Sequence, residues 1–195
     1  MTHVTTKLLF VLTLLLGSGV TNHLLAQNLY RLAGKPVLAV KGTSTLHDWE
    51  MSSAQATGKA EMLVEGAGLK NVKSGSITMK AESLKSGKGK MDEIAYESLK
   101  TNKHADIQFT LTSFKNLSGK KAQAAGNLTI AGVTKPVVFT VDTSINGELV
   151  SLAGEAAIKF SDFNIKPPTA MMGTIKTGNE LTLLFKVNFQ QAAIQ

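Results

Sequence analysis

The chain has 195 residues, no cysteine and a formal net charge of +7. A chain without cysteine has no disulfide framework, no thiolate nucleophile and no cysteine ligand for a metal. Its positive charge comes from lysine, since Arg31 is the only arginine, and this argues against a nucleic-acid partner, because nucleic-acid readers use arginine for bidentate contacts to bases and phosphates.

Residues 1–26 have the organisation of a secretory signal peptide. Lys7 precedes an apolar run over residues 8–16, which is followed by small residues and by a cleavage position after Ala26. The run is too short for a membrane-spanning helix, which needs roughly 20 apolar residues. We therefore expect a periplasmic or secreted protein whose mature part, residues 27–195, is one domain.

Apolar and polar residues alternate along almost the whole mature chain, as in strands with one apolar face. Turn residues separate the alternating segments, and Asn146-Gly147 is typical of a type I′ hairpin. The predicted strands are residues 37–41, 48–64, 74–81, 106–114, 121–131, 136–145, 149–160 and 181–189. Strands of this number and kind predict an all-β fold, a single antiparallel barrel of about eight strands.

One segment has helical periodicity. Met91, Ile94 and Leu99 lie at the spacing of one helix face, acidic residues occupy the first turn, and Lys100 stands at the end. We expect a short amphipathic helix over residues 91–100, packed across the end or the side of the barrel.

Three motifs carry a family resemblance. They are Gly42-Thr-Ser-Thr-Leu-His-Asp-Trp49, residues 126–141 (GNLTIAGVTKPVVFTV) and residues 166–178 (KPPTAMMGTIKTG). Together they resemble the YceI-like family of lipocalin-like, polyisoprenoid-binding periplasmic proteins, over about residues 37–189. The resemblance implies an elongated lumen that holds a polyisoprenoid or similar long-chain lipid, with no other cofactor.

The same alternation predicts which side chains face the lumen, because alternate residues of a strand share one face. In small barrels such a face either packs solid or lines a ligand cavity, and the resemblance implies the cavity. The expected lipid-binding wall is Phe109, Leu111, Leu128, Ile130, Val137, Phe139, Val141, Ile158, Phe160, Leu183, Phe185 and Val187.

Four residues are candidates for the lumen mouth or for contact with a lipid head group. Trp49 either plugs the barrel end or flanks the mouth, where His47 would meet the head group. Met171 and Met172 lie in a loop, where flexible thioethers adapt to lipids of variable shape or pack the loop onto the barrel.

Catalytic and metal sites have little support in this chain. Ser44, His47 and Asp48 are too close in sequence to form a triad, which assembles from separate elements, and His47, Asp48 and His104 lack paired metal-ligand spacing. We expect no enzyme and no metal site. Two alternatives stay open: a structural or stress-related interaction module with a side-chain-filled barrel, and an enzyme acting on a lipid or quinone through His47 or His104.

The lysines are scattered singly along polar strand faces. Solvation and protection of strand edges explains such a distribution, and weak contact with an anionic membrane surface is the alternative. A homodimer also stays open, because nothing in the alternating strands distinguishes a monomer from a dimer.

Overall fold

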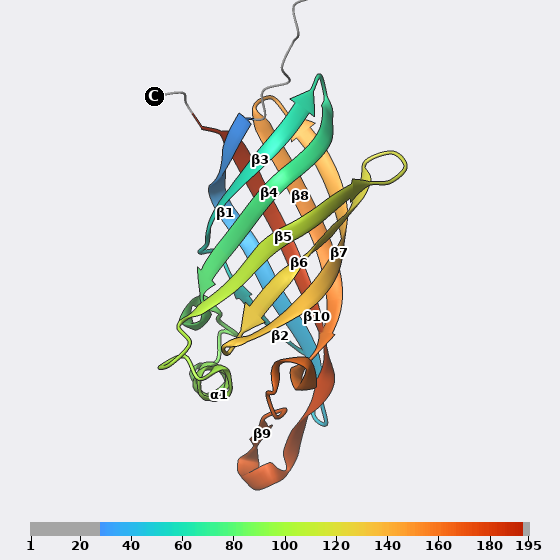
Figure 1. Cartoon of the computed structure of the whole chain (residues 1–195). Coiled ribbons are helices and arrows are strands. Elements are labelled where there is room, and N and C mark those ends of the chain that lie inside the picture. The colour runs from blue at the N-terminus through green and yellow to red at the C-terminus, as the bar shows by residue number, and fades with distance from the viewer. Residues whose placement is uncertain (1–27, 193–195) are drawn as a thin grey trace, which may run out of the picture.

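The computed structural model describes residues 28–192. Eight of its strands close into an antiparallel barrel in the order β1-β3-β4-β5-β6-β7-β8-β10, and β10 pairs back onto β1 (Figure 1). The expected all-β barrel with one short helix is confirmed. The predicted signal peptide lies outside the described residues, and no helix within residues 28–192 is long and apolar enough to cross a membrane.

The barrel strands are long, and two short strands flank them: β2 against β1 and β9 against β10. The barrel is built from β1 (Asn28–Ser44), β3 (Thr57–Glu65), β4 (Gly68–Lys80), β5 (Asp106–Asn116), β6 (Lys121–Ile130), β7 (Val133–Asn146), β8 (Leu149–Lys159) and β10 (Ile175–Gln191). The remaining elements are β2 (Trp49–Ser53), β9 (Thr169–Ala170), α1 (Gly89–Leu99) and the short helices η1 (Ala81–Ser83), η2 (Phe160–Phe163) and η3 (Met171–Gly173).

The segment predicted as one strand over residues 48–64 is two strands, β2 and β3. The side chain of Ser53 interrupts the ladder, because its hydroxyl oxygen accepts a hydrogen bond from the Gln55 N–H (3.1 Å) and donates to the Gln55 carbonyl (3.2 Å). A local bond of this kind competes with strand pairing. The two pieces still follow one another along β1, β2 pairing near Val40 and β3 near Tyr30.

Strand β1 is far longer than the predicted residues 37–41. Its pairing with β10 slips between Ala33 and Val37, beside Gly34, whose φ is +70°. Between these pairs β1 advances by four residues and β10 by two, and the irregular stretch contains Gly34 and Pro36, residues typical of turns. It therefore conceals a continuous strand from a search for strict alternation.

The predicted type I′ turn at Asn146-Gly147 is wrong by one residue. Asn146 pairs with Leu149, which leaves Gly147 and Glu148 as the loop, and only Gly147 has a positive φ, of 60°. One positive φ at the first loop position is the pattern of a type II′ turn, whereas type I′ needs two.

One end of the barrel is filled by side chains. The end shared by the β3–β4 and β7–β8 hairpins, at the top of Figure 1, contains a buried apolar cluster. Its members are Tyr30, Ala60, Met62, Leu69, Val72, Val150, Val187 and Phe189. We call this the closed end. Helix α1 and the β9 hairpin lie at the opposite end.

Candidate functional site

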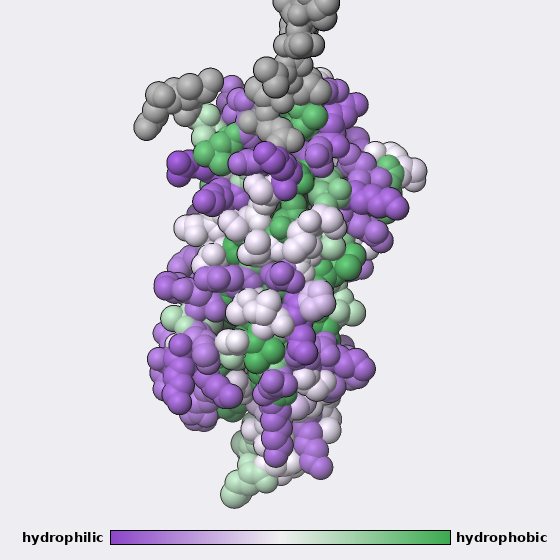
Figure 2. All heavy atoms as spheres, viewed as in Figure 1, coloured by the Kyte–Doolittle hydropathy of each residue, from purple (hydrophilic) through white to green (hydrophobic). Residues whose placement is uncertain are grey.

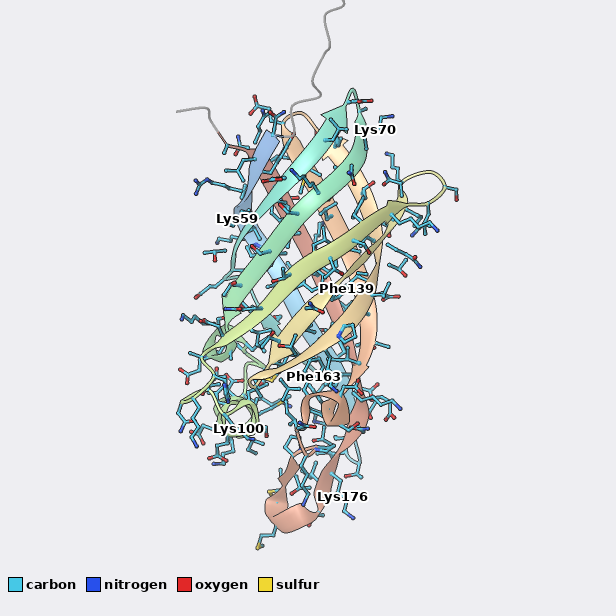
Figure 3. The ribbon with its side chains drawn as sticks, in the orientation of Figure 1. Lys59, Lys70, Lys100, Phe139, Phe163 and Lys176 are labelled. Carbon is cyan, nitrogen blue, oxygen red and sulfur yellow. The ribbon has the colours of Figure 1, made fainter. Side chains whose placement is uncertain are left out.

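A cavity of about 540 Å³ occupies the barrel between the closed end and α1. This volume lies within the usual range of small-molecule sites, roughly 300–1,000 Å³. Side chains from all eight barrel strands and from one face of α1 form its wall, and they are overwhelmingly aliphatic or aromatic. Phe139 projects into it from β7 (Figure 3). The cavity is therefore suited to an apolar chain rather than to a polar metabolite.

Three phenylalanines form the aromatic centre of the wall. The ring of Phe139 meets those of Phe109 and Phe185 edge to face, at centroid distances of 5.4 and 5.3 Å. An edge-to-face pair of rings adds a favourable interaction to the free energy gained by burying the rings. Because the three residues come from β5, β7 and β10, their contacts join opposite sides of the barrel.

Two glycines give these rings their space. A Cβ at Gly126 would overlap the ring of Phe109, and a Cβ at Gly154 would lie 2.8 Å from Cε1 of Phe185. Both glycines face the lumen, so the rings lie flat over backbone where any side chain would displace them. The shape of the lumen thus depends on the two glycines, which have no side chain, as well as on the phenylalanines.

Eleven of the twelve predicted wall residues line this cavity. Val137 does not, and is instead enclosed in the adjoining buried cluster. The wall also includes side chains outside the predicted set, from β1, β2, β4 and α1, among them Val40, Met51, Met79 and Met91. Val40 and Met79 lie in segments of alternating polar and apolar residues, so the same alternation could have assigned them to the wall. Contact of any of these side chains with a lipid stays a prediction.

Exposed residues that line the cavity come from the start of α1 and from two loops that are joined by hydrogen bonds, and this places the mouth between them. The N–H of Thr45 donates to the Lys176 carbonyl (3.0 Å), and the Lys176 N–H donates to the Thr45 hydroxyl (3.1 Å). We call these loops, residues 44–48 and 165–178, the tip. In Figure 1 the β9 hairpin of the tip projects beyond the barrel, past α1.

His47 and Trp49 both lie on the rim of the cavity. Nδ1 of His47 donates to the Asp48 carbonyl (2.7 Å), and the Ser44 hydroxyl bridges the His47 backbone. These bonds hold His47 in a turn, where its side chain is exposed. Trp49 is half-buried and donates its indole N–H to the Thr43 carbonyl (3.0 Å). Its ring lies against Gly42, in the space that a side chain at that position would occupy.

The two predicted methionines separate in the structure. Met171 is on the rim and 72% exposed, whereas Met172 is fully exposed and does not line the cavity. His104 is also away from the wall, with its ring against Gly132 in the β6–β7 turn. Among residues 28–192 no three His, Asp or Glu side chains gather as metal ligands would, so His47, Asp48 and His104 form no such set.

Residues 36–189 match the family model of the YceI-like domain. The chain belongs to the YceI-like family. A UPF0312 protein of Pseudomonas putida is 32% identical over 108 residues, which is 51% of this chain and 56% of that protein. Protein YceI of Shigella flexneri is 38% identical over 74 residues, 35% of this chain and 38% of the relative. The matched segments thus span about half, or less, of these curated relatives.

Solved structures share the fold of this YceI-like barrel. BcnA of Burkholderia cenocepacia superposes with a TM-score of 0.66 at 17% identity, covering 78% of this chain and 95% of BcnA. A polyisoprenoid-binding domain from Saccharophagus degradans, implicated in plant cell wall breakdown, gives 0.61 at 12% identity, covering 84% and 98%. At these identities the comparison shows a shared barrel fold.

Helix α1 of the YceI-like barrel is fastened beside the mouth by polar contacts at its start and middle. Asp92 accepts hydrogen bonds from the Ser86 N–H (2.8 Å) and hydroxyl (2.6 Å), and the Tyr96 hydroxyl donates to the Leu84 carbonyl (2.9 Å). The bonds from Ser86 hold the pKa of Asp92 below its ordinary value, because they favour the charged carboxylate.

This lowered pKa predicts a pH-dependent anchor for α1. A carboxyl group whose pKa is lower in the folded state adds stability above its unfolded pKa, near 4, and loses it as pH falls through the folded value. Asp92→Asn should therefore lower the free energy of unfolding by about 1 kcal/mol at neutral pH, and the difference from wild type should shrink below about pH 4. Urea unfolding at both pH values measures it; equal stabilities at neutral pH would contradict the anchor.

Proposed function

We propose that this YceI-like protein binds a polyisoprenoid or similar long-chain lipid in its lumen and acts as a carrier or sequestering protein. The observation that carries the proposal is an apolar cavity of about 540 Å³, closed at one end and open beside α1. Burial of each methylene group contributes about 0.8 kcal/mol. A chain that enters partway therefore gains ample affinity, and many small contacts share it.

The alternative of an interaction module with a side-chain-filled barrel has less support. The closed end is filled by side chains, and a cavity extends from it past the three phenylalanines to α1. Holding such a volume open costs packing energy, which a bound lipid would recover. The cavity therefore favours a ligand.

An enzymatic role also has less support than a binding role. His104 lies off the cavity wall, and the Nδ1 of His47 is engaged by a backbone carbonyl in an exposed turn. Within residues 28–192, His47 Nδ1 bonds to a backbone carbonyl and neither histidine forms an ion pair with a carboxylate that would orient it as an acid or base. We propose a non-catalytic protein whose bound group is the lipid itself.

Export is part of the same proposal. Residues 1–26 carry the pattern of a signal peptide, and a lipid carrier outside the cytoplasm would shuttle hydrophobic molecules between membranes. N-terminal sequencing of the exported protein should find a start at or near Gln27.

Mass spectrometry tests the binding function directly. Protein exported in a Gram-negative host and examined under native conditions should retain a lipid, and organic extraction should release a long-chain, isoprenoid-like molecule. The stripped protein should take up a polyprenol with one lipid per barrel. Protein that carries no lipid and takes none up would remove the proposed function.

A further inference from the structure

The most exposed apolar side chains of residues 28–192 lie on the tip. Met172 is fully exposed, Met171 is 72% exposed and Leu46 is 65% exposed. The other large apolar residues that reach the surface are only 41–55% exposed and are scattered over β1, β7 and the β5–β6 turn. In Figure 2 the projecting end of the molecule is correspondingly pale green. The tip thus concentrates exposed apolar surface at the cavity mouth.

The backbone of the tip holds its methionines outward at a conformational cost. Met171 and Met172 have φ angles of 52° and 55°, a left-handed conformation that is unfavourable for a residue with a side chain. The β9–β10 hairpin encloses them, with Ala170 paired to Ile175 and the Thr174 N–H donating to the Met171 carbonyl. Backbone strain of this kind clusters at functional sites such as ligand clamps.

Positive charge accompanies these apolar side chains. Residues 165–178 include Lys166 and Lys176 but no aspartate or glutamate, and residues 44–48 add one acidic residue, Asp48. Lys176 lies on the tip in Figure 3. Lys88 and Lys90 stand on the α1 side of the mouth, and Lys90 forms an ion pair with Glu93 (2.9 Å). Apolar side chains flanked by lysines match the surface of an anionic bilayer, where thioethers enter the acyl region and ammonium groups remain among the head groups.

We propose that the tip inserts into an anionic lipid bilayer, so that the cavity mouth opens onto the membrane and the lipid chain passes between bilayer and lumen without crossing water. The passage of cargo rests on the proposed function; the docking itself does not. Tip residues Leu46 and Met171 also line the cavity, so an inserted tip places the wall in continuity with the acyl chains. A chain that crossed water would instead expose its methylene groups, each at an unfavourable free energy.

A single label on the tip tests the docking. Because the chain has no cysteine, Met172→Cys carries an environment-sensitive fluorophore at one position, and Val138→Cys, on the outer face of β7 and 55% exposed, is the matched control. Vesicles of phosphatidylcholine and phosphatidylglycerol should shift the emission at position 172 to the blue and leave position 138 unchanged. No shift at 172, or equal shifts at both positions, would overturn the proposal.

Flotation with the same vesicles measures the energetic contribution of the tip. Leu46→Ser/Met172→Ser should lower the vesicle partition coefficient by about tenfold or more, since each buried large apolar side chain is worth more than the 1.4 kcal/mol of a tenfold change. Val138→Ser should have no effect. Lys166→Gln/Lys176→Gln should weaken the preference for anionic over pure phosphatidylcholine vesicles, and an unchanged preference would contradict the role of these lysines.

Native mass spectrometry of the same preparations separates the two proposals. Protein that carries lipid but whose tip never responds to vesicles would overturn docking and leave the binding function standing. A tip that responds in protein unable to hold lipid would support docking and overturn the binding function.

Discussion

Phe139→Asp should either empty the lumen or unfold the barrel. Phe139 is 8% exposed and its ring joins those of Phe109 and Phe185 across the cavity. A carboxylate there would have no partner and no water, and a buried unpaired charge costs several kcal/mol or more. Phe139→Ala should retain lipid with only modest loss, since many contacts share the chain, although the barrel itself should lose about 3–5 kcal/mol.

The neighbouring residue provides the control for this prediction. Val138 is on the same strand but faces outward and is 55% exposed, so Val138→Asp introduces the same charge without burial and should leave both lipid occupancy and thermal unfolding unchanged. Occupancy is measured by native mass spectrometry and unfolding by calorimetry. A folded Phe139→Asp protein with its full lipid load would show that this face does not contact the ligand.

Gly126→Ala should destabilise the barrel although it adds a single methyl group. The new Cβ would lie 2.5 Å from the Thr110 carbonyl oxygen and would overlap the Phe109 ring. Backbone has no rotamer that relieves such a contact, so β5 and β6 must separate, and Phe109 must leave its edge-to-face position. We expect a loss of about 1–3 kcal/mol in the free energy of unfolding.

Gly75→Ala is the matched control for this change. Gly75 also faces the lumen, but a Cβ there would lie 3.7 Å from Ala60 and Leu111, an ordinary contact. Alanine restricts the unfolded chain more than glycine does, so this variant should keep its stability or gain up to about 1 kcal/mol. Denaturant unfolding of both variants decides the matter, and similar losses in the two would mean that the space over Gly126 is not specially required.

The wall of the lumen was largely predictable, because a strand records its two faces in consecutive residues. Leu128 and Ile130 on β6, and Leu183 and Phe185 on β10, were assigned inward from alternation and line the cavity. Residues that depend on local irregularities were harder to predict. The first half of β1 was missed because its pairing with β10 is irregular between Ala33 and Val37, in a stretch that contains Gly34 and Pro36, residues typical of turns.

Features of the candidate site that depend on contacts between residues far apart in sequence were harder to predict. The role of Gly126 depends on the ring of Phe109, and the position of the rim depends on the bonds between Thr45 and Lys176, 131 residues apart. The exposure of Met172 could not be inferred either, because the same motif would suit a methionine packed onto the barrel. Contacts of this kind follow from strand register, which local sequence does not specify.

Residue periodicity was enough to predict an antiparallel barrel with an apolar interior and a single amphipathic helix, because periodicity is a property of neighbouring residues. It did not predict that β1 closes onto β10, that one end is packed while the other is open, or that a cavity remains around three phenylalanines; the folded barrel shows these features. The reason is that closure, register and cavity volume depend on how strands far apart in the chain pair. The register of each pair depends in turn on the registers of all the other pairs in the barrel.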